Sequence, residues 1–218
     1  MPKVNFTKKA RTDIYARGVK VTKKNRKGED VIVYDKTKKG EDDTLRVKAG
    51  ESYYWWKFAF GPKIISTTAP SRSQLTQSPF LQQLYELEDS TIANASAESV
   101  QDLEDLRDEW VGEIESMRDE CQDNKDNMPE QLQEVGSGAI LGERIDALDS
   151  WISDLEGWSS NIDEEQLRAD AEAEWDTLDE DEQEDMDKDA WVNDKFNETL
   201  QEAIDSELDE LKSFTCGL

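Results

Sequence analysis

Charge and composition divide this sequence into two parts that favour different secondary structures. Residues 1–80 carry 18 Lys and Arg against 8 Asp and Glu, whereas residues 81–218 carry 8 against 44. The first part is rich in Val, Ile, Tyr, Trp and Thr, which favour strands, and the second in Glu, Leu, Ala and Gln, which favour helices. We therefore predict an α+β protein, in which a small basic antiparallel β-domain precedes an acidic antiparallel α-helical bundle or coiled coil.

The change in composition falls on a polar segment that contains two prolines, Pro70 and Pro79. We predict a basic, aromatic-rich β-domain at 1–70, a linker at 71–79 and an acidic helical domain at 80–218. Ser78 is placed to cap the first helix, and Pro79 suits its first position because the backbone N–H there needs no partner.

The strongest strand pattern is at 52–60, and it is followed by a turn at Gly61 and Pro62 and a second strand at 63–68. Shorter strands are expected at 31–34 and 44–48. One face of the 52–60 strand carries Tyr54, Trp56, Phe58 and Phe60. Because a domain of about 70 residues needs large side chains to bury enough area, we expect this face to form the core.

The opposite face of that strand, together with the basic segments before it, forms our candidate nucleic-acid interface. Aromatic rings among cations offer stacking surfaces to single strands, and a basic sheet can enter a duplex groove. The candidate residues are Lys8, Lys9, Arg11, Arg17, Lys23, Lys24, Arg26, Lys27, Tyr53, Trp55, Lys57 and Lys63. Three alternatives remain open: burial of the aromatic face under another segment, docking of the basic residues on the acidic part, and simple solvation.

Apolar residues spaced by three and four predict amphipathic helices in the second part. The expected helices lie at 78–92, from Ser96 or Ser99 to 121, at 141–155, at 162–178 and along a last stripe from 186 to 211. Short breaks between them favour antiparallel neighbours. Cys121 falls on an apolar stripe with no basic cluster beside it, so we expect a buried thiol rather than a nucleophile. Residues 136–142 are expected to form a loop and a helix cap, because no strand precedes them.

Several function classes are excluded by composition. The chain contains no His, which excludes a Ser-His-Asp triad and a His-ligated metal, and two cysteines cannot build a zinc ribbon. No apolar run approaches the roughly 18 residues of a membrane span, and the basic N-terminus lacks the apolar segment of a secretory signal. We expect a soluble, cytoplasmic protein that stays out of membranes and that has no enzyme activity, catalytic residue, metal site or cofactor.

Compact folding would give the acidic part a high charge density. Four side-by-side helices of about 34 residues would each be about 50 Å long, and the net charge would then amount to about one per 1.4 Å. Duplex DNA carries about one charge per 1.7 Å. The acidic part could therefore mimic DNA, although an acidic surface also serves solubility alone.

Five segments resemble a family of uncharacterised phage-encoded proteins. They are Lys9–Tyr15, Gly50–Phe58, Arg72–Ser78, Asn127–Glu130 and Glu143–Leu148. The resemblance implies a phage or prophage origin, and it implies no activity. Residues 54–68 are also similar to the β-sheet arm-type DNA-binding domain of phage integrases, in the order aromatic strand, glycine turn, Lys and Ser/Thr strand. This chain departs from that pattern at Ala59, where a basic residue is usual, and at Ile64–Ile65, where the strand is usually more polar.

These observations lead to three hypotheses. The first is a non-enzymatic phage protein that binds nucleic acid or a nucleoprotein through its basic β-domain and uses its acidic helical domain for assembly or docking. The second is a DNA-mimic decoy that inhibits a basic, DNA-binding host protein. The third is a virion-associated structural protein. A homo-oligomer is compatible with each, and the expected location is the host cytoplasm or the virion.

Overall fold

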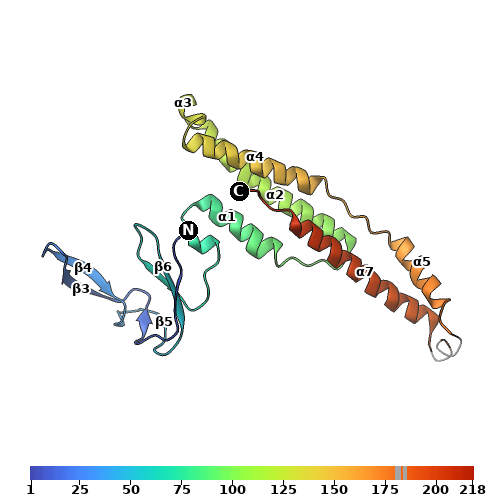
Figure 1. Ribbon diagram of the computed structural model, residues 1–218, viewed down its shortest axis with the longest axis horizontal. Coiled ribbons are helices and arrows are strands. Elements are labelled where there is room, and N and C mark those ends of the chain that lie inside the picture. Colours follow the sequence, from blue (N-terminus) through green and yellow to red (C-terminus); the bar gives the residue numbers. More distant parts are fainter. Residues whose placement is uncertain (180–182, 184–185) are drawn as a thin grey trace. The chain divides into compact units, whose positions relative to one another are not determined.

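The computed structural model describes residues 1–179, 183 and 186–218, which form two compact units, Met1–Glu86 and Leu87–Leu218 (Figure 1). The first unit contains antiparallel strands and a short helical segment, and the second unit is helical. The predicted α+β class, with antiparallel strands in the N-terminal part, is therefore confirmed.

The strands of the first unit pair in three antiparallel groups. A three-stranded sheet has the order β1 (Asn5–Thr7), β6 (Tyr53–Lys57), β7 (Lys63–Ser66). Two further pairs join β2 (Ile14–Tyr15) to β5 (Leu45–Val47) and β3 (Val19–Lys24) to β4 (Asp30–Asp35). Because successive side chains alternate across a strand, Tyr53 and Trp55 lie on one face of β6 and Trp56 lies on the other.

The core of the first unit joins two of these groups, the three-stranded sheet and the β2–β5 pair. Its buried cluster consists of Ala10, Val47 and Ile65, and the half-buried side chains of Ile14, Tyr53 and Trp55 pack against it. Val47 belongs to β5 and Ile65 to β7, so the β2–β5 pair contributes to the core on one face of the three-stranded sheet.

The aromatic face that we expected to be the core is buried only in part. Trp56 is buried, Tyr54 and Phe58 are half-buried, and Phe60 is fully exposed. The prediction for Phe60 is wrong because β6 ends at Lys57, so the alternation of a strand no longer applies three residues later. Tyr54 lies beside Phe6 of the neighbouring strand, with ring centroids 4.9 Å apart.

The segment that we predicted as a linker, 71–79, has regular structure. It contains a short 3₁₀ helix, η1 (Ser73–Leu75), which packs against α1 (Pro79–Glu86). The division between the two compact units falls after Glu86 rather than within 71–79, because η1 and α1 are part of the first unit.

The predicted start of α1 is confirmed. The helix begins at Pro79, and the Leu81 N–H donates to the Ser78 hydroxyl at 3.4 Å. The Arg72 guanidinium lies 4.6 Å from the centroid of the Tyr85 ring, a cation–π contact that joins the segment before the helix to its last turn.

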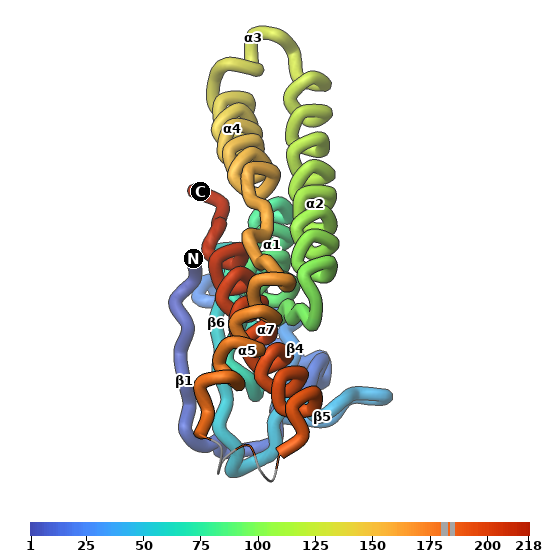
Figure 2. The backbone as a smooth tube through the Cα atoms, turned by 90° about the vertical axis from the view of Figure 1, so that its right-hand side faces the viewer, coloured from blue at the N-terminus to red at the C-terminus, as the bar shows by residue number. Residues whose placement is uncertain are grey.

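The second unit begins with a π-helical segment, η2 (Leu87–Ile92), and continues through helices that pack in pairs. These helices are α2 (Val100–Asp126), α3 (Glu130–Gln133), α4 (Ser137–Glu156), α5 (Glu164–Trp175) and α7 (Lys188–Ser213). Figure 2 shows α2 and α4 side by side, with the chain reversing at α3, and α5 beside α7. Helix α2 also contacts α7, which joins the two pairs.

The predicted apolar stripes form the core of this unit. Helix α2 buries Leu103, Trp110, Ile114, Met117 and Cys121, and α4 buries Leu141, Leu148, Trp151, Ile152 and Leu155. The predicted burial of the Cys121 thiol is confirmed, and this burial raises its pKa. Gly136 has a φ of 59° and is the N-cap residue of α4, in agreement with the expected helix cap. The expected loop over 136–142 is wrong, because residues 137–142 already form the first turns of α4.

The helices differ from the four equal helices on which the DNA-mimic estimate rests. Helices α2, α4, α5 and α7 have 27, 20, 12 and 26 residues. They pack in the pairs α2–α4 and α5–α7, and α2 also contacts α7. The estimate of about one charge per 1.4 Å assumed four equal helices, so DNA mimicry stays a hypothesis.

Candidate nucleic-acid interface

The aromatic face that we predicted as a stacking surface is partly covered. Tyr53 and Trp55 are half-buried and pack against the core cluster that includes Val47 of β5. This is the outcome that the first alternative anticipated, because another segment of the same chain covers part of the face. Only part of the surface of Tyr53 and Trp55 is therefore available for stacking, and their role in nucleic-acid binding stays a prediction.

A lysine lies over the rings that remain accessible. The Nζ atom of Lys63 is 4.0 Å from the centroid of the Trp55 ring and 5.8 Å from that of Tyr53. Lys63 is on β7, which pairs directly with β6. Such cation–π contacts hold the ammonium group in place, so the aromatic pair positions a cation instead of a base.

Beside these rings is a pocket of about 390 Å³ that we call the cationic pocket. Four cations line it: Lys9, Arg11, Lys36 and Lys63. Tyr53, Ile14 and Ile65 provide its apolar surface, and Thr7, Thr12 and Thr37 add hydroxyl groups. Within residues 1–86, all of which the structure describes, no Asp or Glu is part of this lining.

The four cations of the cationic pocket are not neutralised by ion pairs. None of its four cations forms an ion pair of 4.0 Å or less with a carboxylate of the described residues. Cations gathered in a concave, partly apolar surface focus the electrostatic field and raise the local concentration of anions. The arrangement therefore favours an anionic ligand with acceptor oxygens.

Lys9 and Arg11 enter the pocket because the residue between them is anchored. Ala10 is buried, its N–H donates to the Glu51 carbonyl at 2.7 Å, and its own carbonyl accepts from the Gly50 N–H at 2.9 Å. With Ala10 held in the core, the two long basic side chains on either side remain at the surface, where both are exposed.

Lys36 is positioned by a turn at the end of β4. The Asp35 carboxylate accepts hydrogen bonds from the hydroxyl of Thr37 at 2.7 Å and from its backbone N–H at 3.1 Å. These two bonds lower the pKa of Asp35, so the turn is held by a charged carboxylate at neutral pH. The Lys36 carbonyl in turn accepts from the Tyr15 N–H at 2.8 Å.

The structure brings together only part of the predicted site. Of the predicted residues, Lys9, Arg11, Tyr53 and Lys63 line the cationic pocket. Lys8 is exposed beside Lys9, and Arg17 is exposed in the connection from β2 to β3. Lys23, Lys24, Arg26 and Lys27 are exposed at the end of the β3–β4 hairpin, and Lys57 lines a different pocket with Phe58 and Leu81.

Lys36 was absent from the predicted site. It belongs to a basic cluster with Lys38 and Lys39 that the sequence makes visible. Its place in the pocket depends on the pairing of Val19 with Asp35, which brings the end of β4 back beside the start of β3. No local pattern indicates that pairing, because β3 has mostly polar residues.

Cationic side chains are few in the helical unit. Residues 87–218 contain 8 Lys and Arg against 43 Asp and Glu. Among the described residues, no group of three or more His, Cys, Asp and Glu side chains is arranged to hold a metal ion. Every helix in the described part of the chain is too short or too polar to cross a lipid bilayer.

Comparisons with known proteins identify no relative. No protein-family model, no curated protein and no solved structure matches this chain significantly.

Proposed function

We propose that this is a non-enzymatic phage protein whose β-unit binds nucleic acid, alone or within a nucleoprotein, through the cationic pocket. The observation that supports this proposal is the convergence of Lys9, Arg11, Lys36 and Lys63 on one pocket without a carboxylate in its lining. On this proposal the protein acts in the cytoplasm of the host cell or is carried in the virion.

The chemistry of the pocket suits a phosphodiester backbone better than a base. Lys and Arg side chains and Thr hydroxyl groups are common donors to phosphate oxygens. The rings of Tyr53 and Trp55 are engaged by the core and by Lys63, so they support a cation rather than stack on a base. Binding through such contacts is independent of sequence and depends strongly on salt.

We assign the helical unit to assembly or docking. Its helices pack in the pairs α2–α4 and α5–α7, and α2 and α4 bury their apolar stripes. An acidic surface of this kind attracts basic partners and repels free nucleic acid, so it directs nucleic acid toward the β-unit. A basic host protein or a second copy of the chain is the corresponding partner.

The test uses the full chain and two matched pairs of substitutions. Lys9→Gln with Lys36→Gln removes two charges from the cationic pocket, and Lys38→Gln with Lys39→Gln removes two exposed charges outside it. Fluorescence anisotropy at low salt measures binding of a labelled single-stranded and a labelled duplex DNA. We expect the pocket pair to weaken binding by about tenfold or more, because each lost contact is a charge-assisted hydrogen bond.

The control pair distinguishes binding at a defined site from attraction by the overall positive charge of the β-unit. If Lys38→Gln with Lys39→Gln weakens binding as much as the pocket pair, the positive charge acts without a defined site. If the unaltered chain binds neither DNA nor RNA at low salt, the proposal is wrong.

A further inference from the structure

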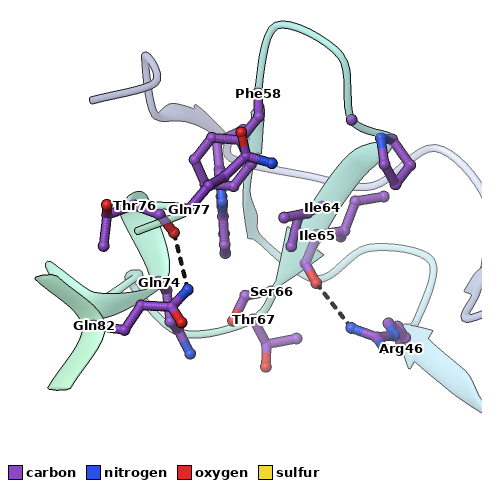
Figure 3. A pocket seen from close by; sticks show the side chains of 13 residues that line it. Arg46, Phe58, Ile64, Ile65, Ser66, Thr67, Gln74, Thr76, Gln77 and Gln82 are labelled. Carbon is purple, nitrogen blue, oxygen red and sulfur yellow. Dashed lines mark hydrogen bonds between the residues drawn. The ribbon is translucent and has the colours of Figure 1, made fainter. Parts of the chain in front are cut away.

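A second pocket, of about 760 Å³, lies on the other face of the sheet, between β6–β7 and the η1–α1 segment (Figure 3). We call it the amide pocket, because three of its lining residues are glutamines, Gln74, Gln77 and Gln82. Trp56 and Phe58 provide aromatic surface, and Arg46 adds a cation. The lining contains no carboxylate in residues 1–86, which the structure describes in full.

Trp56 is a buried donor without an acceptor. Its side chain lines the amide pocket, the residue is 2% exposed, and its Nε1–H has no hydrogen-bond partner among the described residues. Buried indole N–H groups normally find an acceptor. Trp110 and Trp151 also lack one, but they are enclosed between packed helices, whereas Trp56 borders an open pocket.

The glutamine amides have free hydrogen-bonding capacity. The Gln82 Nε2–H donates to the Thr76 carbonyl at 3.0 Å, which fixes this side chain and leaves its oxygen as an acceptor (Figure 3). The side-chain amides of Gln74 and Gln77 form no hydrogen bond with any described residue. Each amide can both donate and accept, so the pocket suits a ligand whose edge carries both kinds of group.

Arg46 defines one end of the pocket. Its Nη1 atom donates to the Ile65 carbonyl at 3.5 Å, a long hydrogen bond that directs the guanidinium along β7 (Figure 3). A guanidinium has five N–H donors, so most of them remain available to an anionic group.

We infer that the amide pocket binds a nucleotide. The heteroaromatic base packs against Phe58 and Trp56, its polar edge exchanges hydrogen bonds with the glutamine amides, and an acceptor atom takes the Trp56 N–H. The phosphate group lies toward Arg46. The volume falls within the range of small-molecule sites, about 300–1,000 Å³. The nucleotide is either a free mononucleotide or one unit of a nucleic-acid strand, and both share this chemistry.

This inference deepens the proposed function, but it rests on different residues. Tyr53 lines the cationic pocket and Trp56 lines the amide pocket, and these side chains lie on opposite faces of β6. Ile65 lines both pockets, but the residues substituted in the two tests line only one of them each, so the two proposals can fail separately.

The test titrates the full chain with each of the four ribonucleoside monophosphates and with a short single-stranded oligonucleotide, by isothermal titration calorimetry. Gln77→Leu removes an exposed amide of the pocket, and Gln83→Leu is the matched control on an exposed glutamine outside it. We expect Gln77→Leu to weaken nucleotide binding by about tenfold, as loss of a hydrogen bond in a site does, and Gln83→Leu to leave it unchanged.

Trp56→Phe tests the role of the indole N–H that has no acceptor, because this substitution removes the N–H and retains an aromatic ring. We expect weaker binding with an unfolding midpoint close to that of the parent chain. If Trp56→Phe unfolds the protein, Gln77→Leu alone decides the question, since that side chain is exposed.

The two ligand sources give different results. Binding of a mononucleotide that Gln77→Leu weakens supports a free-nucleotide site. Binding of the oligonucleotide alone, weakened by Gln77→Leu and not by Gln83→Leu, supports a site for one unit of a strand. Absence of all binding, or binding that Gln77→Leu does not weaken, overturns the inference. The Lys9→Gln and Lys36→Gln pair, which tests the proposed function, should leave mononucleotide binding unchanged.

Discussion

At the scale of single residues, Gly18 determines how closely the start of β3 approaches the end of β4. Its φ is 76°, and a Cβ atom there would lie 2.6 Å from the carbonyl carbon of Asp35 and 2.7 Å from the Cα atom of Lys36. Both distances are too short for a side chain, so only glycine permits this approach. Because Lys36 lines the cationic pocket, Gly18 also influences the position of one of its four cations.

We therefore expect Gly18→Ala to destabilise the β-unit and to weaken DNA binding, since the backbone of Asp35 and Lys36 must move. Gly28→Ala is the matched control: Gly28 also has a positive φ, of 82°, but open space surrounds it. Gly28→Ala should lower the free energy of unfolding by only about 1–2 kcal/mol, the strain of a non-glycine residue at a positive φ. Thermal unfolding and anisotropy measure both effects, and equal losses in the two variants would argue against the close approach.

A second residue-scale feature is the buried carboxylate of Asp43. Burial alone would raise the pKa of Asp43, but backbone N–H groups, among them those of Arg17 at 2.9 Å and of Gly18, donate to it and hold its pKa below the ordinary value of 3.8. A carboxylate with a lowered pKa stabilises the folded state above that ordinary value, and the stabilisation is lost as the pH falls through the lowered one.

Asp43→Asn should therefore lower the unfolding midpoint at neutral pH, and the difference from the parent chain should shrink as the pH falls below about 4. The measurement is thermal unfolding across this pH range, with Glu41→Gln as an exposed neighbouring control. A difference that persists undiminished in strong acid would contradict the role of the charged carboxylate.

At the scale of elements, helix α2 has two candidate N-cap residues in the sequence, Ser96 and Ser99. In the structure the N-cap is Ser99, whose hydroxyl accepts from the Asp102 N–H at 3.2 Å. The Asp102 carboxylate accepts from the Glu98 N–H at 3.0 Å, and this bond, together with one from the Ser99 hydroxyl, lowers the pKa of Asp102. The pair resembles a reciprocal capping box.

Ser99→Ala should lower the free energy of unfolding by about 1 kcal/mol, the usual cost of losing an N-cap. Ser96→Ala, at an exposed serine in front of the helix, should have little effect. Urea denaturation monitored by the helical circular dichroism signal provides both values. A larger effect at Ser96 would mean that the helix is capped elsewhere.

The elements differ in how far local sequence predicts them. Helices α2 and α4 follow from apolar residues at intervals of three and four, and the buried stripe from Leu103 to Cys121 lies where the pattern places it. Strand β3 was not predicted, because four of its six residues are Lys or Thr and it forms by pairing with β4. Phe60 shows the opposite failure, where an alternating pattern continues beyond the end of the strand.

At the scale of the whole molecule, two units of opposite charge are joined in one chain. The β-unit, residues 1–86, contains 18 Lys and Arg against 9 Asp and Glu, and the helical unit contains 8 against 43. The sequence predicts this asymmetry and the α+β class. It does not predict which cations converge, because Lys9, Lys36 and Lys63 come from three segments that only the strand pairing brings together.

The salt dependence of DNA binding tests the central claim most directly. Each phosphate contact adds about 0.7–0.9 to the slope of log affinity against log salt concentration. For the full chain, we predict that Lys9→Gln with Lys36→Gln reduces this slope by about 1.4–1.8, whereas Lys38→Gln with Lys39→Gln leaves it nearly unchanged. An unchanged slope in the pocket pair, or an equal reduction in both pairs, would contradict a phosphate-binding site at the cationic pocket.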